Sequence, residues 1–186
     1  DADGMRAVEE LREQFRRVPG VVAVGASRMV PLFSGRLGLG GLRAPGYVGP
    51  DDTDRIQADW DSVAPGYFDA LEIPITRGRA FDGRDRQGAQ YVAIINETLA
   101  ERLWPGQDPI GRQLLQQQPG GDDRPLHIVG VTAPAKSASI SEPPTNFIYV
   151  PLAQQYLSDL TFFVRHTEGE SRLAELRRAV VAFNPN

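Results

Sequence analysis

Few residues of this chain have the type and spacing that chemistry at a site requires. His127 and His166 are its only histidines; each lies in a strand-like run, and neither has a second ligand at metal-site spacing. Ser27, within Gly25-Ala26-Ser27-Arg28-Met29, resembles half of a nucleophile elbow, but the second glycine is missing and Met29 cannot make the strained strand-to-helix turn. We therefore expect both histidines to be structural strand residues and Ser27 not to be a nucleophile.

Two carboxylates form a second candidate for chemistry. Asp59 and Asp61 are two residues apart on a predicted strand, so they share a face and could act as an acid/base pair. Trp60 lies on the opposite face, where it is expected to pack inward. The carboxylates are then expected to be the solvated side of the strand.

The remaining chemistry is limited by residues that the sequence lacks. Without cysteine there is no thiol nucleophile, cysteine-ligated zinc or iron–sulfur cluster. Gly38-Leu39-Gly40-Gly41 lacks the third glycine of a dinucleotide loop and the Lys-Ser/Thr of a P-loop. The sequence therefore predicts no catalytic residue, no metal site and no cofactor, and a protein that is not an enzyme.

The composition of the chain indicates the class of protein and limits the kinds of partner that it can bind. The 186 residues fit one domain, and 41% hydrophobic with 24% charged residues is typical of a globular protein. The net charge of −4 argues against a nucleic-acid partner, because binding phosphates requires a basic surface.

Apolar periodicity predicts the helices. Apolar residues from Met5 to Val18 recur at three- and four-residue steps and predict a helix that ends at Pro19-Gly20. A short helical turn is expected over 66–71, and Asn96 is a good N-cap for a helix over 97–104. The last helix is expected to be capped by Ser171, with its buried face formed by Leu173, Leu176, Val180 and Phe183.

Apolar or alternating runs predict the strands, over 21–26, 55–63, 91–95, 126–131, 147–150 and 160–166. They mix with the helices without strict βαβ alternation, so the predicted fold class is α+β. We expect the chain ends, 1–64 and 155–186, to build one lobe of a single domain. Residues 65–154 would be a second lobe inserted into it.

A glycine-rich segment over 33–54 shows no sustained period. Six of its residues are glycine, so ordering it costs much conformational entropy. We expect it to be a mobile, partner-facing loop, with Leu37, Leu39 and Tyr47 as contact candidates. An idle linker is the alternative.

Four blocks of sequence together resemble a known family. They are Ser62 to Pro74 continuing into Arg77-Gly78-Arg79-Ala80-Phe81, Val92 to Ala100 with Trp104-Pro105-Gly106 and Asp108-Pro109-Ile110-Gly111, His127-Ile128-Val129-Gly130-Val131 with Glu142-Pro143-Pro144, and Tyr149-Val150-Pro151-Leu152. In this order they resemble the MacB-like periplasmic core domain of ABC transporter permeases. The similarity is greatest to orphan permeases that carry two such domains and no fused ATPase.

The resemblance implies a fold and a role. The fold would be a porter-like lobe from the chain ends with an inserted, small mixed α/β lobe of the Sabre type. The role would be a non-catalytic extracytoplasmic domain of an inner-membrane permease, which transmits conformational change and docks a partner or substrate. Implied partners are the transmembrane helices of the parent permease, a separate ATP-binding subunit, and a second permease copy or a periplasmic partner.

Two further expectations complete the prediction. Both chain ends resemble cuts, so we expect membrane helices before Asp1 and after Asn186 in a parent protein. The alternative function is a ligand-binding or sensing module of a membrane protein, which a concave pocket with convergent polar groups would favour.

Overall fold

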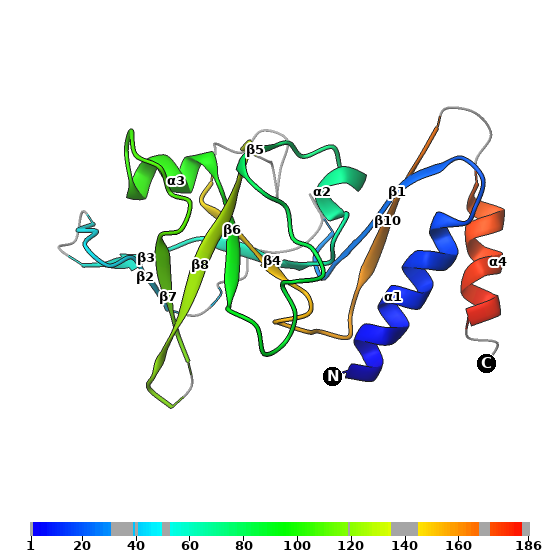
Figure 1. Cartoon of the computed structure of the whole chain (residues 1–186), viewed down its shortest axis with the longest axis horizontal. Helices are drawn as coiled ribbons and strands as arrows, with labels where there is room; N and C mark the ends of the chain where they lie inside the picture. The colour runs from blue at the N-terminus through cyan, green and yellow to red at the C-terminus, as the bar shows by residue number, and fades with distance from the viewer. Residues whose placement is uncertain are drawn as a thin grey trace.

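A mixed β-sheet runs through the length of the molecule (Figure 1). The computed structural model describes residues 2–30, 39, 41–49, 53–118, 120–134, 145–167 and 172–183. Its helices are α1 (Ala2–Arg16), α2 (Tyr67–Ala70), α3 (Glu97–Leu103) and α4 (Leu173–Phe183). Its strands are β1 (Val21–Ser27), β2 (Leu42–Arg43), β3 (Arg55–Ile56), β4 (Asp59–Val63), β5 (Ile75–Gly78), β6 (Val92–Asn96), β7 (Gln113–Gln117), β8 (Asp123–Thr132), β9 (Phe147–Pro151) and β10 (Thr161–His166).

The order of the strands joins distant parts of the chain. It is β10-β1-β4-β9-β6-β8-β7-β2-β3, with β5 also paired to β8. The β4–β9 and β6–β8 pairs are parallel, whereas β1–β10, β6–β9 and β7–β8 are antiparallel. This mixed sheet with few helices confirms the predicted α+β class.

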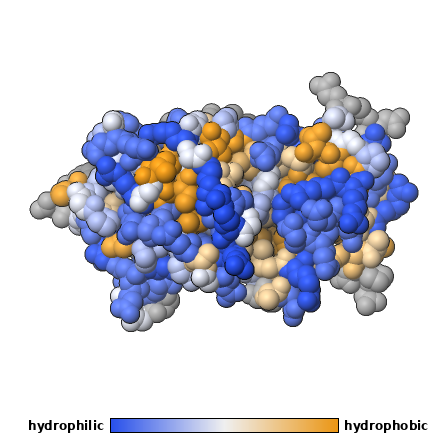
Figure 2. Space-filling model, viewed as in Figure 1, coloured by the Kyte–Doolittle hydropathy of each residue, from blue (hydrophilic) through white to orange (hydrophobic). Residues whose placement is uncertain are grey.

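The first and last elements lie together at one end of the sheet (Figure 1). Val8 and Phe15 are buried on the inner face of α1, where the Phe15 ring meets Phe162 of β10 edge-on at 5.5 Å. Figure 2 shows mostly hydrophilic side chains over the outer face of this helix. The helix and strand predicted from the first 26 residues are therefore confirmed.

The capped helix is also confirmed. Asn96 ends β6, and its Oδ1 accepts a hydrogen bond from Leu99 N at 3.1 Å, as expected of the N-cap of α3. The same oxygen accepts from Phe147 N at 3.2 Å, and Nδ2 donates to Thr145 O at 2.7 Å. One side chain thus fixes both the start of α3 and the start of β9.

The last helix differs from the prediction. α4 forms, but it buries none of its side chains: Leu173 is 52% exposed and Val180 is 44% exposed, and Leu176 and Phe183 are half-buried. The helix lies beside α1 at the edge of the sheet (Figure 1), and its periodicity could not indicate what it packs against. The predicted cap, Ser171, lies outside the described residues.

The segment over 33–54 and the strand after it also differ from the prediction. Leu42–Arg43 forms β2 and pairs with both β3 and β7, so part of the expected loop is sheet. The strand expected over 55–63 is divided into β3 and β4, with Gln57 and Ala58 between them. β2 pairs with β7, a strand that was not predicted, β3 pairs with β2, and β4 pairs with β9.

The limits of the two lobes, 64/65 and 154/155, stay a prediction. One buried cluster joins Leu42, Ile56 and Trp60 to residues such as Ile95 and Leu114. A smaller cluster beside α1 joins Val8, Ala26, Ala64 and Leu152. In the described part of the chain, no helix is both long and apolar enough to cross a bilayer.

Candidate functional site at the junction of β1 and β4

The sheet is narrowest where β1 meets β4. Among the described residues these strands share one register pair, Ser27 with Val63, whereas β1 follows β10 from Val21 to Ser27 and β4 follows β9 over its whole length. Two backbone hydrogen bonds flank the pair, Arg28 N to Ser62 O at 3.2 Å and Ala64 N to Ala26 O at 2.8 Å. This short pairing connects the end of the sheet that carries α1 to the rest.

Two glycines allow α2 to lie directly against β1. A Cβ on Gly25 would lie 2.4 Å from the Cα of Tyr67, and one on Gly66 would lie 2.5 Å from the carbonyl oxygen of Val24. Gly66 also has a φ of 86°, which other residues rarely adopt. The backbones at the junction are therefore as close as glycine permits.

A buried arginine ties α1 to the same point. Arg12 is 2% exposed, and its Nη2 donates to Pro65 O at 2.5 Å, while Nη1 pairs with Glu9. Burial lowers the pKa of the Arg12 guanidinium, and the Glu9 carboxylate opposes that effect. Helix α1 is thus hydrogen-bonded to the segment between β4 and α2.

Asp61 is the buried carboxylate of the junction. It is 1% exposed, and its Oδ1 accepts from Ser62 N at 2.7 Å and from Met29 N at 3.2 Å. Burial raises the pKa of Asp61 to about 6, although hydrogen bonding with Ser27, Met29 and Ser62 and the charge of Arg28 act in the opposite direction. Burial also raises the pKa values of its neighbours Tyr67 and Tyr149.

The expectation that the Asp61 face is solvated was therefore wrong. Trp60 packs inward as predicted, but the opposite face of β4 is covered as well, because Val63, Tyr67 and Tyr149 form a second buried cluster there. A strand in the middle of a sheet can be buried on both faces, and alternation then says little about exposure. Asp59 is half-buried, so the two carboxylates are not an exposed pair.

Arg28 and Trp60 form the other polar part of the junction. The Arg28 Cζ lies 4.6 Å from the centroid of the Trp60 ring, a cation–π contact. Arg28 Nε and Nη2 and Trp60 Nε1 are buried without a hydrogen-bond partner in the described structure. The junction thus contains one buried carboxylate, two arginines and several hydrogen bonds within the protein.

The other candidate residues, Ser27 and the two histidines, do not lie together in the fold. Ser27 Oγ donates to Met29 O at 2.6 Å and is buried. His166 pairs with Val21 at the far end of β1, and His127 lies on β8, separated from β1 by three strands. The described residues contain no group of His, Asp and Glu side chains that could hold a metal ion.

Two of the contact candidates, Leu39 and Tyr47, pack on the large buried cluster and not at the junction. Leu39 is 5% exposed, and its carbonyl accepts from Gln116 Nε2 at 3.0 Å. Tyr47 packs partly against the same core, and its hydroxyl accepts from Arg102 Nε at 3.1 Å. Leu37 lies outside the described residues. Their contact role stays a prediction, and the Leu39 side chain could reach a partner only if this segment opened.

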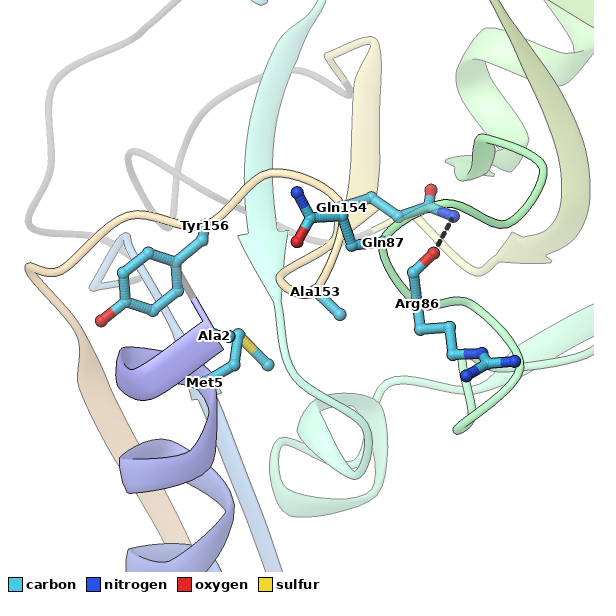
Figure 3. Close-up of a pocket in the computed structure, with 7 residues that line it drawn as sticks. All are labelled: Ala2, Met5, Arg86, Gln87, Ala153, Gln154 and Tyr156. Carbon is cyan, nitrogen blue, oxygen red and sulfur yellow. Dashed lines mark hydrogen bonds between the residues drawn. The ribbon is translucent and has the colours of Figure 1, made fainter.

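A pocket lies beside the junction, between the first turn of α1, the connection from β9 to β10 and the loop after β5 (Figure 3). Its volume is about 390 Å³, and its lining consists of Ala2, Met5, Arg86, Gln87, Ala153, Gln154 and Tyr156. The sequence did not indicate this pocket, because its walls come from three segments that are distant in the chain.

A family model places the chain in a family, and relatives of known sequence agree with it. The family model for the MacB-like periplasmic core domain matches residues 2–183. The macrolide export ATP-binding/permease protein MacB of Rhodospirillum rubrum is 28% identical over 158 residues, 80% of this chain and 21% of that protein. The pyoverdine export ATP-binding/permease protein PvdT of Pseudomonas aeruginosa is 27% identical over 126 residues, 67% of this chain and 16% of that protein. The chain spans about a fifth of these curated relatives.

Solved structures share the fold. The periplasmic region of MacB from Actinobacillus actinomycetemcomitans matches with a TM-score of 0.62 and 13% identity, covering 96% of this chain and 74% of that one. The extracellular domain of the noncanonic ABC-type transporter YknZ from Gram-positive bacteria matches with a TM-score of 0.59 and 19% identity, covering 96% and 82%. These likenesses are consistent with the porter-like and Sabre architecture. The chain therefore belongs to the MacB-like periplasmic core domains and is the extracytoplasmic, periplasmic domain of a MacB-like ABC permease of the inner membrane.

Proposed function

We propose that this domain is a non-catalytic part of its transporter, which transmits conformational change between the membrane helices of the permease and a partner or substrate outside the membrane. The observation that carries the proposal is the single register pair between β1 and β4.

Each side of the junction has its own packing. On one side, α1 covers the antiparallel pair of β1 and β10, and Phe15 meets Phe162. On the other, β4, β9, β6, β8 and β7 pair side by side over two buried clusters. Hinge motion in proteins is absorbed by a few residues between packed bodies. We assign that role to residues 25–28 and 61–67.

The transporter context follows from the family. We propose that the membrane helices of the parent permease hold the end of the sheet that carries α1, β1 and β10, and that the other end, from β4 to β3, meets a second permease copy or a periplasmic partner. ATP would be hydrolysed by a separate cytoplasmic subunit. Leu37, Leu39 and Tyr47 would contribute to the outer contact, with Leu39 exposed only on opening.

A disulfide across the junction tests the hinge. Ser27 and Val63 are a non-hydrogen-bonded antiparallel pair, flanked by the two bonds from Arg28 N and Ala64 N, so their Cα atoms are about 4.5 Å apart and suit a disulfide. The natural chain has no cysteine. In the parent permease, assembled with its ATP-binding subunit in liposomes, Ser27→Cys with Val63→Cys should lower the ATPase rate several-fold when oxidised and restore it on reduction.

A second disulfide provides the matched control. Gln113 and His127 are paired in register on β7 and β8, beside the bond from Ile128 N to Arg112 O, and both lie on the same side of the junction. Gln113→Cys with His127→Cys should leave the rate unchanged in both redox states. Equal rates for oxidised and reduced Ser27→Cys/Val63→Cys would contradict the proposal.

A further inference from the structure

We infer that the pocket between α1, the β9–β10 connection and the loop after β5 is a binding site for an amphipathic organic anion, a carboxylate or phosphate attached to an apolar body. This inference goes beyond the proposed transmission of movement and does not depend on it. It rests on an apolar wall, an uncompensated cation and a fixed frame around the pocket.

The apolar wall belongs to α1 and to the residues after β9. Ala2, Met5, Ala153 and Tyr156 contribute methyl groups, a thioether and an aromatic ring. Figure 3 shows Met5 and Tyr156 close together on one side of the pocket. A Cβ on Gly4 would lie 2.1 Å from the Tyr156 hydroxyl oxygen, so glycine at this position lets the first turn of α1 lie against the ring.

The opposite wall carries a cation. Arg86 is exposed, and its guanidinium has no hydrogen-bond or ion-pair partner among the described residues. The arginines near it in sequence are paired, Arg79 with Asp85 and Arg84 with Asp82. No carboxylate lines the pocket. A flexible, unpaired guanidinium beside a wall without acidic groups favours an anion, which it can bind through two parallel hydrogen bonds.

Gln154 holds the frame in place. Its Oε1 accepts from Val92 N at 3.1 Å, and its Nε2 donates to Gln90 O at 2.8 Å and to Arg86 O at 3.4 Å (Figure 3). The amide is therefore committed to the protein and fixes the backbone of Arg86 relative to the strand β6. Recognition of a ligand is left to Arg86, Gln87 and the Tyr156 hydroxyl.

The size of the pocket limits the ligand. Small-molecule pockets are commonly about 300–1,000 Å³. At about 390 Å³ this one is near the lower limit, which suits a single ring or a chain of medium length and not a large polycyclic molecule. Decanoate, which joins one carboxylate to a medium-length chain, is a suitable probe.

Methionine-methyl NMR of the domain tests the inference directly. The chain has two methionines: Met5 lines the pocket, and Met29 is buried in the junction and does not line it. Decanoate titrated below its micelle concentration should shift the Met5 methyl resonance saturably and leave that of Met29 in place. Arg86→Gln should weaken binding about tenfold, the loss expected for one charge-assisted contact.

Matched variants and ligands decide the outcome. Arg84→Gln removes an exposed arginine that does not line the pocket and should bind as the natural sequence does, whereas Ala2→Trp should block the pocket from its exposed rim. Decyl maltoside, which has a similar chain and no charge, should bind at least about tenfold more weakly than decanoate. Sedimentation with phosphatidylglycerol vesicles distinguishes a lipid source from a dissolved anion. Equal weakening by Arg84→Gln and Arg86→Gln, equal binding of both ligands, or association with vesicles without a Met5 shift from decanoate would each overturn the inference.

Discussion

Asp61 shows at the scale of a single residue how the junction balances charge against burial. Its carboxyl group lies near β1, Tyr67, Tyr149 and the cation Arg28, and it accepts hydrogen bonds from the backbone N–H groups of Ser62 on β4 and of Met29 just after β1. Desolvation exceeds these favourable contacts, so the pKa is raised to about 6. The group therefore changes charge near neutral pH at the point where the two sides of the sheet meet.

Asp61→Asn should stabilise the domain above pH 6. The unfolded chain ionises Asp61 near pH 3.8 and the folded domain near 6. Below pH 3.8 the group is neutral in both states and does not oppose folding. From about pH 3.8 to 6 the unfolded chain ionises while the folded domain keeps the proton, so the free energy of unfolding falls, and above about 6 the fold must hold a buried carboxylate. The shift of about two pKa units corresponds to about 3 kcal/mol as an upper limit. Asparagine keeps the acceptor oxygen, so urea denaturation at pH 7.5 should show a gain of about 2 kcal/mol.

The pH dependence separates this cause from others. At pH 4 the difference between the variant and the natural sequence should fall below about 1 kcal/mol, because position 61 is then neutral in the folded domain and only about half ionised in the unfolded chain. Asp122→Asn, which replaces an exposed carboxylate, should give no comparable gain at pH 7.5. A difference for Asp61→Asn that stays constant from pH 4 to 7.5 would rule out ionisation as its source.

At the scale of elements, periodicity and capping residues correctly predicted the helices and strands that are determined by interactions between residues close in sequence. The helix before Pro19-Gly20, the cap at Asn96 and the buried strands β6, β8 and β9 were all predicted, because periodicity and capping act within a few residues. β2, β3 and β7 were missed or misjudged. β2 depends on pairing with β7, more than 70 positions away, and β3 is ordered through β2. β7 pairs with nearby β8, but its short run gave no signal that was recognised. The sequence also did not predict that β4 is buried on both faces, and Asp61 with it, because this burial depends on pairing with β9, which is distant in the sequence.

Asn96 caps α3 and also hydrogen-bonds the backbone before β9. Two substitutions can separate the contributions of these two roles to stability. Asn96→Ala should lower the free energy of unfolding by about 2–3 kcal/mol, because it removes the cap and leaves buried N–H and carbonyl groups near Phe147 and Thr145 unpaired. Asn96→Ser keeps a capping oxygen for Leu99 N and should recover about 1 kcal/mol of that loss. Equal losses in chemical denaturation would mean that the cap contributes nothing.

The close packing of α2 on β1 can be tested with a pair of glycines. Gly25→Ala should cost about 2 kcal/mol or more, because its Cβ would meet the backbone of Tyr67, which cannot move without separating α2 from β1. Gly83→Ala adds the same methyl group where no atom lies within 4 Å, and its effect should be within about 0.5 kcal/mol of zero. Thermal unfolding of both variants gives the comparison, and similar costs would show that the close approach is not rigid.

For the whole molecule, composition and the four sequence blocks indicated the fold class and the family, because they depend on residues that specify turns and buried strands. The arrangement of the site could not be predicted in this way. The pocket joins Met5, Arg86 and Tyr156, and the junction joins Arg12, Ser27 and Asp61. These residues come together only when α1 and β1 pack against segments that lie several tens of residues later in the chain.

Hydrogen exchange can show whether the two sides of the junction open separately. Amides of β1 and β10 lie beyond the single pair with β4, in an end of the sheet where β10 residues are only half-buried, whereas β6 is fully buried. Regions with few buried contacts open at lower free energy than the core. We expect β1 and β10 amides to exchange at least about tenfold faster than those of β6 and β8. The oxidised Ser27→Cys/Val63→Cys disulfide should reduce that difference, because it holds β1 against β4, and the Gln113→Cys/His127→Cys disulfide should not. If all four strands exchange at one rate in the natural sequence, the domain opens as one cooperative unit and cannot bend at this junction.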